Sequence, residues 1–321
     1  MTHAIVAKQP GGPDVLEYAS VEPPVPGPGQ LLVKVAAAGV NFIETYQRSG
    51  AYKVNYPFTP GAEAAGTVEA VGEGVQDFAI GSRIATAEGA KTYADYTLVD
   101  AAKALPVPDG VDDQTAAALP LQGITAHYLM NSSFRVEPGH TVLLHAGAGG
   151  VGLLLTQLLK ARGARVITTV SSDEKAKLSK LAGADDVLRY DGFADKVREL
   201  TDGEGVNVVF DGVGRDTFDD SLKSLRIRGT MVLFGAASGP VPPFDPQRLN
   251  SGGSLSVTRP TMAHFLQNAR ERRWRSTEIF EAAANGTLTV RVGASYPLAE
   301  AAQAHRDLEG RLTTGKVLLI P

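Results

Sequence analysis

The feature that most constrains this chain is a glycine-rich turn between an apolar segment and a helix-like segment. Residues 141–145 read as a strand and residues 153–161 as a helix. The turn between them consists of Gly147, Ala148, Gly149, Gly150, Val151 and Gly152. Such glycines allow a tight turn and let backbone N–H groups approach a pyrophosphate, which a helix N-terminus also favours. We therefore predict a dinucleotide site formed by these six residues.

The segments that follow alternate as a parallel sheet requires. Apolar runs suited to buried strands alternate with amphipathic runs suited to helices over 164–170, 173–183, 184–190, 193–202, 206–213, 218–226 and 229–236. Strands of this kind, with helices between them, build a sheet covered on both faces. The expected fold class is α/β, with a Rossmann-type doubly wound domain.

The first hundred or so residues have a different pattern of apolar and turn-forming residues. Short strand-like runs, separated by Gly and Pro, lie at 31–40, 66–75, 82–86 and 93–99, and predict a compact β domain. A helix is expected over 112–130, broken near Pro120, and another near 264–284. The chain then closes with a strand at 316–321.

The residues after the second strand of the cofactor domain indicate which dinucleotide fits. NAD sites usually place an Asp or Glu there, to accept a hydrogen bond from the ribose 2′-hydroxyl. Here Val170 ends the strand, and Ser171, Ser172 and Lys175 supply hydroxyls and a cation that suit a 2′-phosphate. The sequence therefore favours NADPH over NADH.

A purely structural explanation of the same residues stays open. Ser171 and Glu174 have the spacing of a capping box, and Lys175 fits a solvated helix face. Asp173 and Glu174 argue against a phosphate at this position, whereas a capped helix start leaves spare N–H groups that argue for one.

Composition excludes several kinds of site. The chain of 321 residues has no cysteine, so thiolate metal sites and disulfides are excluded, and its six histidines show no ligand spacing. We expect no metal site, and isolated surface or packing roles for the histidines. A net charge of −4 without a basic tract predicts no nucleic-acid or membrane-surface binding. With no apolar run of ~20 residues and no leader-like start, a cytoplasmic location is expected.

Several motifs together resemble one known family. They are GVNFIETYQRSG at 39–50, PFTPGAEAAGTVEAVGEGV at 57–75, LQGITAHYL at 121–129, HAGAGGVGLLLTQ at 145–157, FDGVGRDTFDDSL at 210–222, FGAASGPVPPFD at 234–245 and LTTGKVLL at 312–319. The chain resembles the medium-chain dehydrogenase/reductase superfamily and, within it, the NADPH:quinone oxidoreductases of the zeta-crystallin type. The resemblance implies a GroES-like catalytic domain at 1–121 and 263–321, a Rossmann domain at 122–262, and a homodimer. The strand-like run 253–260 would provide an edge for pairing with a second copy.

The resemblance also bears on metal chemistry. Zinc-dependent alcohol dehydrogenases of the superfamily hold zinc with a Cys and a His where this chain has Asn41 and Ala62. Without zinc to lower the pKa of an alcohol oxygen, alcohols are poor substrates. A quinone or an α,β-unsaturated carbonyl is already electrophilic and needs only orientation and hydrogen-bond donors.

By resemblance to the family, three residues lie beside the nicotinamide and are candidate catalytic residues. They are Asn41, which would also bind the cofactor, Tyr46 and Tyr52, all able to donate to a quinone oxygen. Ordinary alternatives are a helix cap for Asn41, packing on Phe42 for Tyr46 and loop cover for Tyr52. No obligatory proton donor follows, because solvent can protonate a hydroquinone anion.

The resemblance assigns four further residues to the cofactor: Thr125, Tyr190, Phe234 and Arg311. Their alternatives are a backbone-bonded helix threonine, a half-exposed aromatic, a core phenylalanine and a solvated arginine. The resemblance assigns Lys316 to the cofactor less clearly, and Lys316 is not included among the predicted cofactor-binding residues.

The predicted function is NADPH-dependent, zinc-independent reduction of a quinone. An NADPH-dependent enone or enoyl reductase on the same scaffold is the nearest alternative, because the shape of the loops decides which electrophile enters. A non-catalytic NADPH-binding protein, structural or RNA-binding, is the alternative from another class, although the weakly acidic charge disfavours RNA.

Overall fold

The computed structural model describes all residues, 1–321, and the chain forms two compact units. Unit 1 combines residues 1–124 with 268–321, and unit 2 covers 125–267. The connecting segment is helical on both sides of Pro120. Helices α2 (Asp113–Ala118) and α3 (Pro120–Tyr128) confirm the break predicted there, because proline has no N–H to continue a helix.

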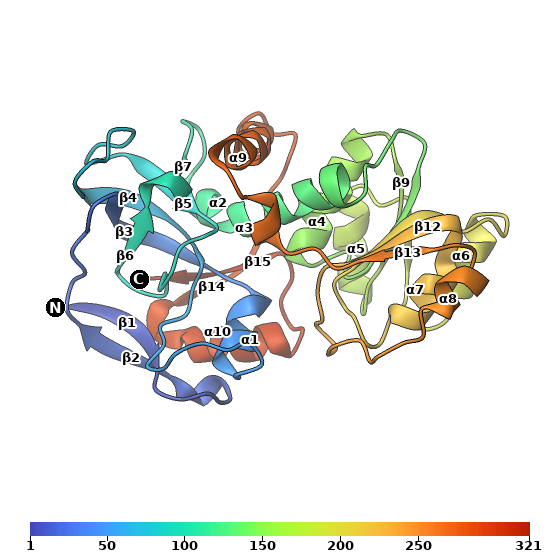
Figure 1. The fold of residues 1–321 in the computed structure, drawn as a ribbon, viewed down its shortest axis with the longest axis horizontal. Coiled ribbons are helices and arrows are strands. Elements are labelled where there is room, and N and C mark those ends of the chain that lie inside the picture. Colours follow the sequence, from blue (N-terminus) through green and yellow to red (C-terminus); the bar gives the residue numbers. More distant parts are fainter. The chain divides into compact units, whose positions relative to one another are not determined.

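Unit 2 contains a six-stranded parallel sheet in the order β10-β9-β8-β11-β12-β13. Figure 1 labels its strands β9, β12 and β13 and the helices α4 to α8 that accompany the sheet. The strands are β8 (Thr141–Leu144), β9 (Arg165–Thr169), β10 (Asp186–Leu188), β11 (Val206–Asp211), β12 (Leu225–Leu233) and β13 (Ser256–Thr258). The helices between them are α4 (Gly150–Ala161), α5 (Asp173–Leu181), α6 (Phe193–Leu200), α7 (Phe218–Ser224) and α8 (Gln247–Ser251). This is the doubly wound Rossmann arrangement that the alternating pattern predicts.

The order of the strands places a switch point between β8 and β11. From β8 the chain runs outward to β9 and β10, and then returns to the other side of β8 to form β11, β12 and β13. Ligands of such sheets bind beyond the carboxyl ends of the strands at this switch. Central strand β11 has Val208, Val209 and Phe210 completely buried, which explains its continuous apolar sequence.

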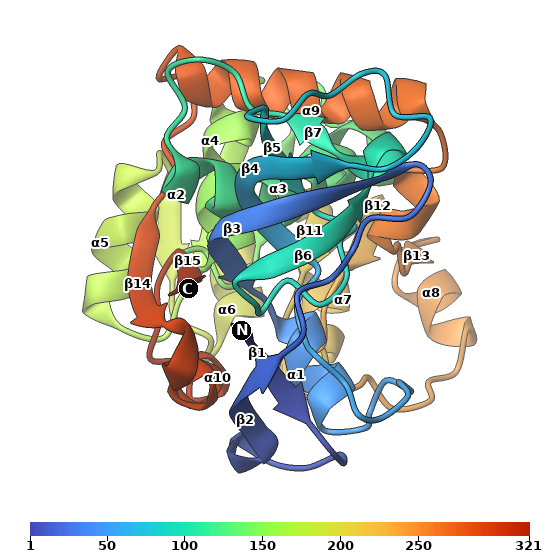
Figure 2. The same ribbon diagram turned by 90° about the vertical axis from the view of Figure 1, so that its left-hand side faces the viewer.

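Unit 1 is built on a seven-stranded, mostly antiparallel sheet (Figure 2). Its strands are β3 (Gln30–Val40), β4 (Glu63–Val71), β5 (Arg83–Thr86), β6 (Tyr96–Asp100), β7 (Leu105–Pro106), β14 (Val292–Pro297) and β15 (Lys316–Ile320). A separate hairpin-like pair is formed by β1 (Thr2–Ala7) and β2 (Leu16–Val21). The helices α1 (Phe42–Arg48), α9 (Ala269–Ala284) and α10 (Ala301–Glu309) complete the unit.

The register of unit 1 places the C-terminal strand against β3, a strand from the first forty residues. β15 pairs with the end of β3, with Leu318 opposite Gly39, and β3 pairs with β4, with Gly39 opposite Glu63. The strand predicted at the C-terminus is thereby confirmed and completes a sheet begun near the N-terminus. No helix in the structure is long and apolar enough to cross a bilayer.

Candidate functional site

A buried polar cluster at the end of β3 contains the predicted catalytic residue Asn41. Asn41 Nδ2 donates to Glu63 Oε2 at 2.9 Å, Lys316 Nζ donates to Asn41 Oδ1 at 2.7 Å, and Lys316 forms an ion pair with Glu63. The three residues are 6%, 0% and 1% exposed. Because an ammonium only donates and a carboxylate only accepts, these partners fix which end of the Asn41 amide is oxygen. One N–H of the amide remains for another acceptor.

Gly39 leaves the space in which this ion pair forms. A Cβ at Gly39 would lie 2.2 Å from Glu63 Oε2 and 2.8 Å from Lys316 Cε. Glu63 Oε1 in turn accepts from the backbone N of Leu121 at 2.7 Å. Every charged atom of the pair therefore has a partner, as buried charges require.

A second buried carboxylate, Glu44, holds the start of α1. Asn41 is the N-cap of this helix, as its alternative role predicts, and its backbone N donates to Glu44 Oε2 at 2.8 Å. The N–H of Ala62 donates to Glu44 Oε1 at 3.3 Å. Burial raises the pKa of Glu44 to about 7, against the opposing attraction of the Lys316 ammonium. The cluster thus holds two carboxylates and one ammonium, and Glu44 takes up a proton near neutrality.

The other end of α1 is held by a chain of buried polar groups. Arg48 forms a bidentate pair with Glu309, at 2.8 and 3.0 Å, and its Nη1 donates to His305 Nδ1 at 3.1 Å. His305 Nε2 lies 3.1 Å from the hydroxyl of Tyr93. Burial, and then the Arg48 charge, lower the pKa of His305 to about 3, so the ring is neutral and donates from Nε2 to Tyr93. Asn41 and Tyr46 therefore stand on a helix anchored at both ends.

The two candidate tyrosines lie against each other on unit 1. The rings of Tyr46 and Tyr52 have centroids 5.3 Å apart, and Tyr52 N donates to Tyr46 O at 2.9 Å. Tyr46 also packs on Phe42 at 6.3 Å, and Tyr52 is 46% exposed. The structure brings the two phenols together, with Tyr46 on the helix that Asn41 caps and Tyr52 in the segment after that helix, and the packing roles that were their alternatives are present as well.

The glycine-rich turn of unit 2 is packed too closely for side chains at two of its positions. A Cβ at Gly147 would lie 2.6 Å from Thr168 Cβ, and one at Gly152 would lie 2.2 Å from Ala146 O. Gly149 is the N-cap of the twelve-residue helix α4, whose first turn has N–H groups without helical partners. Within the same turn Ala148 is buried, and Gly150 and Val151 are half-buried. This cradle fits the pyrophosphate of a dinucleotide.

A buried histidine, His145, lies two residues before this turn, and hydrogen bonds to both of its ring nitrogens hold it in place. His145 Nε2 lies 2.8 Å from Ser221 Oγ, and its Nδ1 lies 2.7 Å from Thr169 Oγ1. Ser221 donates its proton to Asp211 at 3.2 Å, so its oxygen accepts from His145 Nε2. Burial lowers the pKa of His145, which is consistent with a neutral ring. The expectation of isolated roles for the histidines is therefore wrong for His145 and His305, which both belong to buried hydrogen-bond networks.

The residues predicted to hold a 2′-phosphate surround the start of α5. The N-cap is Ser172, whose Oγ accepts from Lys175 N at 3.2 Å, whereas Ser171 is exposed. The predicted capping box of Ser171 and Glu174 is wrong, because the helix begins one residue later and places Lys175 at the third position. Tyr190, after β10, accepts with its hydroxyl from the N–H of Ala146 at 3.2 Å.

The remaining predicted cofactor residues are distributed over both units. Thr125 is buried on α3, and Phe234 follows β12 with its ring over Gly212, where a Cβ would lie 2.9 Å from the ring. Both belong to unit 2. Arg311 is exposed after α10 in unit 1, with a φ of 57°.

The donor atoms of unit 1 do not fit a catalytic zinc. Asn41 and Ala62 hold the positions that the family resemblance assigns to zinc ligands, and the amide oxygen of Asn41 and a carboxylate oxygen of Glu63 both accept from the Lys316 ammonium. No group of three or more His, Cys, Asp or Glu residues in the structure is arranged to hold a metal ion.

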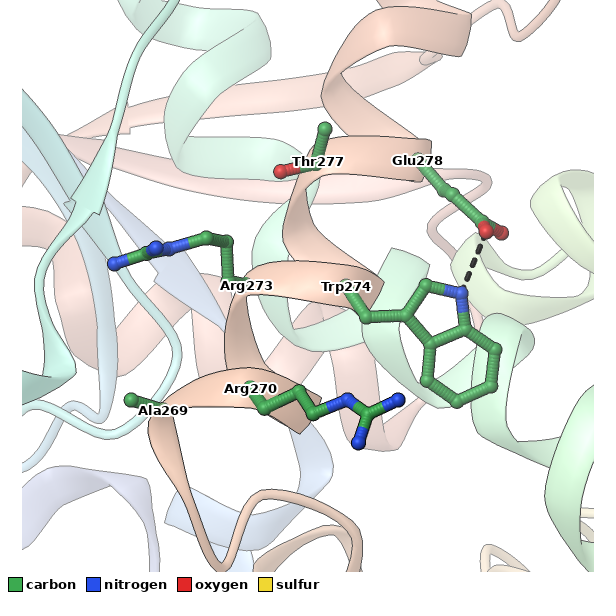
Figure 3. Close-up of a pocket in the computed structure, with 6 residues that line it drawn as sticks. All are labelled: Ala269, Arg270, Arg273, Trp274, Thr277 and Glu278. Carbon is green, nitrogen blue, oxygen red and sulfur yellow. Dashed lines mark hydrogen bonds between the residues drawn. The ribbon is translucent and has the colours of Figure 1, made fainter.

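A separate surface pocket of about 540 Å³ runs along α9 (Figure 3). It is lined by Ala269, Arg270, Arg273, Trp274, Thr277 and Glu278, and Trp274 Nε1 donates to Glu278 at 2.5 Å. Arg270 and Trp274 point to one side of the helix and Arg273 to the other (Figure 3). None of the predicted site residues lines this pocket.

Three residues of the unit 1 cluster were not among the predicted site residues. Glu44, Glu63 and Lys316 are fully or almost fully buried charges that contact Asn41 or its helix. One signal existed for Lys316, which opens an otherwise apolar strand, and another for Glu63, which begins the strand facing the alanine- and glycine-rich end of β3.

Comparison with known proteins agrees with this organisation. Residues 27–109 match the alcohol dehydrogenase GroES-like domain, and residues 150–276 match the zinc-binding dehydrogenase family. A mycobacterial protein solved as a complex with NADPH is 53% identical, with a TM-score of 0.98 over 99% of this chain and 100% of that one. The quinone oxidoreductase of Escherichia coli, also solved with NADPH, is 40% identical, with a TM-score of 0.97 over 99% of this chain and 100% of its own.

A relative with another activity is as similar to this chain in sequence as the Escherichia coli enzyme is. The 2-haloacrylate reductase of a Burkholderia species is 40% identical over 331 residues, which cover 100% of this chain and 99% of the relative. The GroES-like and Rossmann domains, and the identity to a quinone oxidoreductase over nearly the whole chain, settle the family. The chain belongs to the quinone oxidoreductase family of the medium-chain dehydrogenase/reductase superfamily.

Proposed function

We propose that this protein is an NADPH-dependent quinone oxidoreductase that works without a metal ion. The observation that carries the proposal is the buried cluster at Asn41, in which the amide oxygen of Asn41 and a carboxylate oxygen of Glu63 already accept from the Lys316 ammonium. A quinone is reduced without Lewis-acid help, because its carbonyl groups already accept electrons. The relatives solved with NADPH support the choice of cofactor.

Residues of this chain would prepare the reaction by binding and orientation. The glycine turn at 147–152 and the start of α4 would hold the pyrophosphate, and Ser171, Ser172 and Lys175 the 2′-phosphate. Bound NADPH supplies the reducing equivalents. The free N–H of the Asn41 amide would donate to the quinone oxygen as it gains negative charge.

The phenols of Tyr46 and Tyr52 complete the donor set. Tyr46 lies half-buried on the helix that Asn41 caps and Tyr52 is exposed just after it, and a flat quinone can stack on an aromatic face. Solvent provides the protons that the hydroquinone requires, so neither tyrosine needs to act as an obligatory acid.

A second candidate function is the reduction of electron-poor alkenes. It is favoured by the 40% identity to a 2-haloacrylate reductase over the full chain. The two functions need the same cofactor and the same oxyanion donors, and they differ in which electrophile fits beside Tyr46 and Tyr52.

A substrate panel separates these functions. NADPH oxidation is measured with benzoquinones and naphthoquinones, with 2-cyclohexenone and with 2-chloroacrylate, at equal concentrations. We expect quinones to be turned over far faster than the alkenes. The opposite order would make the protein an alkene reductase, and tight NADPH binding without turnover of any substrate would indicate a non-catalytic NADPH-binding protein.

Asn41→Ala provides the matched test of the site. We expect kcat for the quinone to fall by about a hundredfold or more, because one donor to a developing oxyanion is lost. NADPH affinity, measured with the same preparation, reports any contribution of Asn41 to cofactor binding.

The assembly proposed with this function is a cytoplasmic homodimer. Strand β13 (Ser256–Thr258) is the last strand of the unit 2 sheet, and its free edge can pair with the same edge of a second copy. Light scattering after size-exclusion chromatography is expected to give twice the chain mass of 33.7 kDa, and a monomer would contradict the proposal.

A further inference from the structure

Two turns of unit 2 leave the sheet side by side, beyond β9 and β10. Val170 N donates to Leu188 O at 3.0 Å, which extends the pairing of the two parallel strands to their carboxyl ends. The next residue after Leu188 is Arg189, and its Nη2 donates to Oδ1 of Asp173, the first residue of α5. A cation from one turn is therefore held against the helix start of the other.

Arg189 places a positive charge beside the two carboxylates at the start of α5. Asp173 and Glu174 are both exposed in the first turn of α5, next to the serines that would receive a 2′-phosphate. Two carboxylates there would repel a dianionic phosphate at close range. The Arg189 guanidinium compensates the charge of Asp173 and adds a cation that the sequence motifs alone did not indicate.

The pairing with Asp173 leaves Arg189 able to bind a ligand. Its side chain is 42% exposed, and a guanidinium has five N–H donors in a planar fork that matches phosphate oxygens. The Asp173 side chain is 94% exposed, and exposed ion pairs of this kind contribute little free energy because solvent screens them. A phosphate can therefore share or replace Asp173 as the partner of the guanidinium at little cost.

We infer that Arg189 is a specificity-determining residue that contacts the 2′-phosphate of NADPH and selects NADPH over NADH. The inference rests on the proposed use of NADPH and adds to it a named residue from the turn after β10. Asp173 holds the guanidinium in place in the absence of the cofactor, and it opposes the phosphate by its own charge.

The test compares the affinities of both dinucleotides in matched variants. Dissociation constants for NADPH and NADH are measured by calorimetry for the wild-type protein, for Arg189→Gln, and for the control Arg226→Gln, which removes an exposed arginine of β12. We expect Arg189→Gln to weaken NADPH binding about tenfold, the size of a lost charge-assisted hydrogen bond, with NADH binding unchanged. The control should change neither.

A second variant tests whether the charge of Asp173 opposes phosphate binding or whether Asp173 is needed to hold Arg189 in place. Asp173→Asn should bind NADPH as tightly as the wild-type protein or more tightly, because it removes a carboxylate and leaves the arginine. Weaker binding of NADPH alone in this variant would overturn the electrostatic argument.

The failure of this inference differs from the failure of the proposed function. If the wild-type protein prefers NADPH and Arg189→Gln keeps that preference, or weakens both dinucleotides equally, then Arg189 is not a specificity residue. If the wild-type protein shows no preference for NADPH, the proposed cofactor is wrong as well.

Discussion

Replacing Lys316 by Met tests whether the buried ion pair between Lys316 and Glu63 stabilises unit 1 against unfolding and orients the side-chain amide of Asn41. The change keeps an apolar chain of similar length but removes the ammonium that contacts Asn41 Oδ1 and Glu63. Glu63 is then left as a completely buried carboxylate, with Asn41 Nδ2 and Leu121 N as its only neutral donors. Removing one partner of a buried ion pair typically costs about 3–5 kcal/mol, and we expect a loss in that range.

The assay uses the single tryptophan of the chain. Trp274 belongs to unit 1, so its fluorescence in urea follows the unfolding of the unit that contains the cluster. Glu63→Gln and the double variant complete a thermodynamic cycle. The double variant should lose at least about 1 kcal/mol less than the sum of the two single losses, because it leaves no unpaired charge.

Two results would refute this reasoning. A loss of less than about 1 kcal/mol in Lys316→Met would place the pair in the class of weak surface bridges. Strict additivity of the two single variants would show that Lys316 and Glu63 do not stabilise each other.

Three further predictions concern single residues of the two units. Gly39→Ala should lower the stability of unit 1 by about 1–3 kcal/mol in the tryptophan assay, because the new methyl group meets Glu63, and unchanged stability would contradict the packing described. Gly152→Ala should raise the dissociation constant of NADPH about tenfold or more, because its Cβ would lie 2.2 Å from Ala146 O and displace the turn, and an unchanged dissociation constant in calorimetry would contradict the role given to this turn. Glu44 has a pKa raised from 4.5 to about 7, so its folded state binds the proton more tightly and stability falls as pH rises through this window. Relative to Glu44→Gln, the wild-type protein should lose about 3 kcal/mol between pH 4.5 and 8, and parallel pH profiles would show that Glu44 is not perturbed.

The fold of unit 2 was predictable because its signals are local. The strand ending near His145, the glycine turn and the helix to Ala161 follow one another directly, and the strand and helix periodicities after them are continuous. Two expectations for unit 2 were wrong, the cap of α5 and the isolated role of His145. Ser171 and Ser172 are equally good caps by residue type, and in the structure it is Ser172 that caps the helix and accepts from Lys175 N.

The buried cluster of unit 1 could not be predicted in the same way. Glu63 lies 22 residues from Asn41 and 253 residues from Lys316, and the three meet only because β15 and β4 flank β3 in one register. Residues brought together by sheet pairing leave no periodic trace in the sequence. Asn41 was predicted from the resemblance to a known family. Glu63 and Lys316, which orient its amide, were identified only in the structure.

The central claim, reduction of a quinone by NADPH without a metal ion, is tested most directly by measuring turnover and metal content in one sample. The protein is purified with a chelator, its zinc is determined by mass spectrometry, and NADPH oxidation is followed with a naphthoquinone. Full turnover with far less than one zinc per chain, unchanged when zinc is added back, is the result that the structure predicts. Activity that rises in proportion to bound zinc would contradict it.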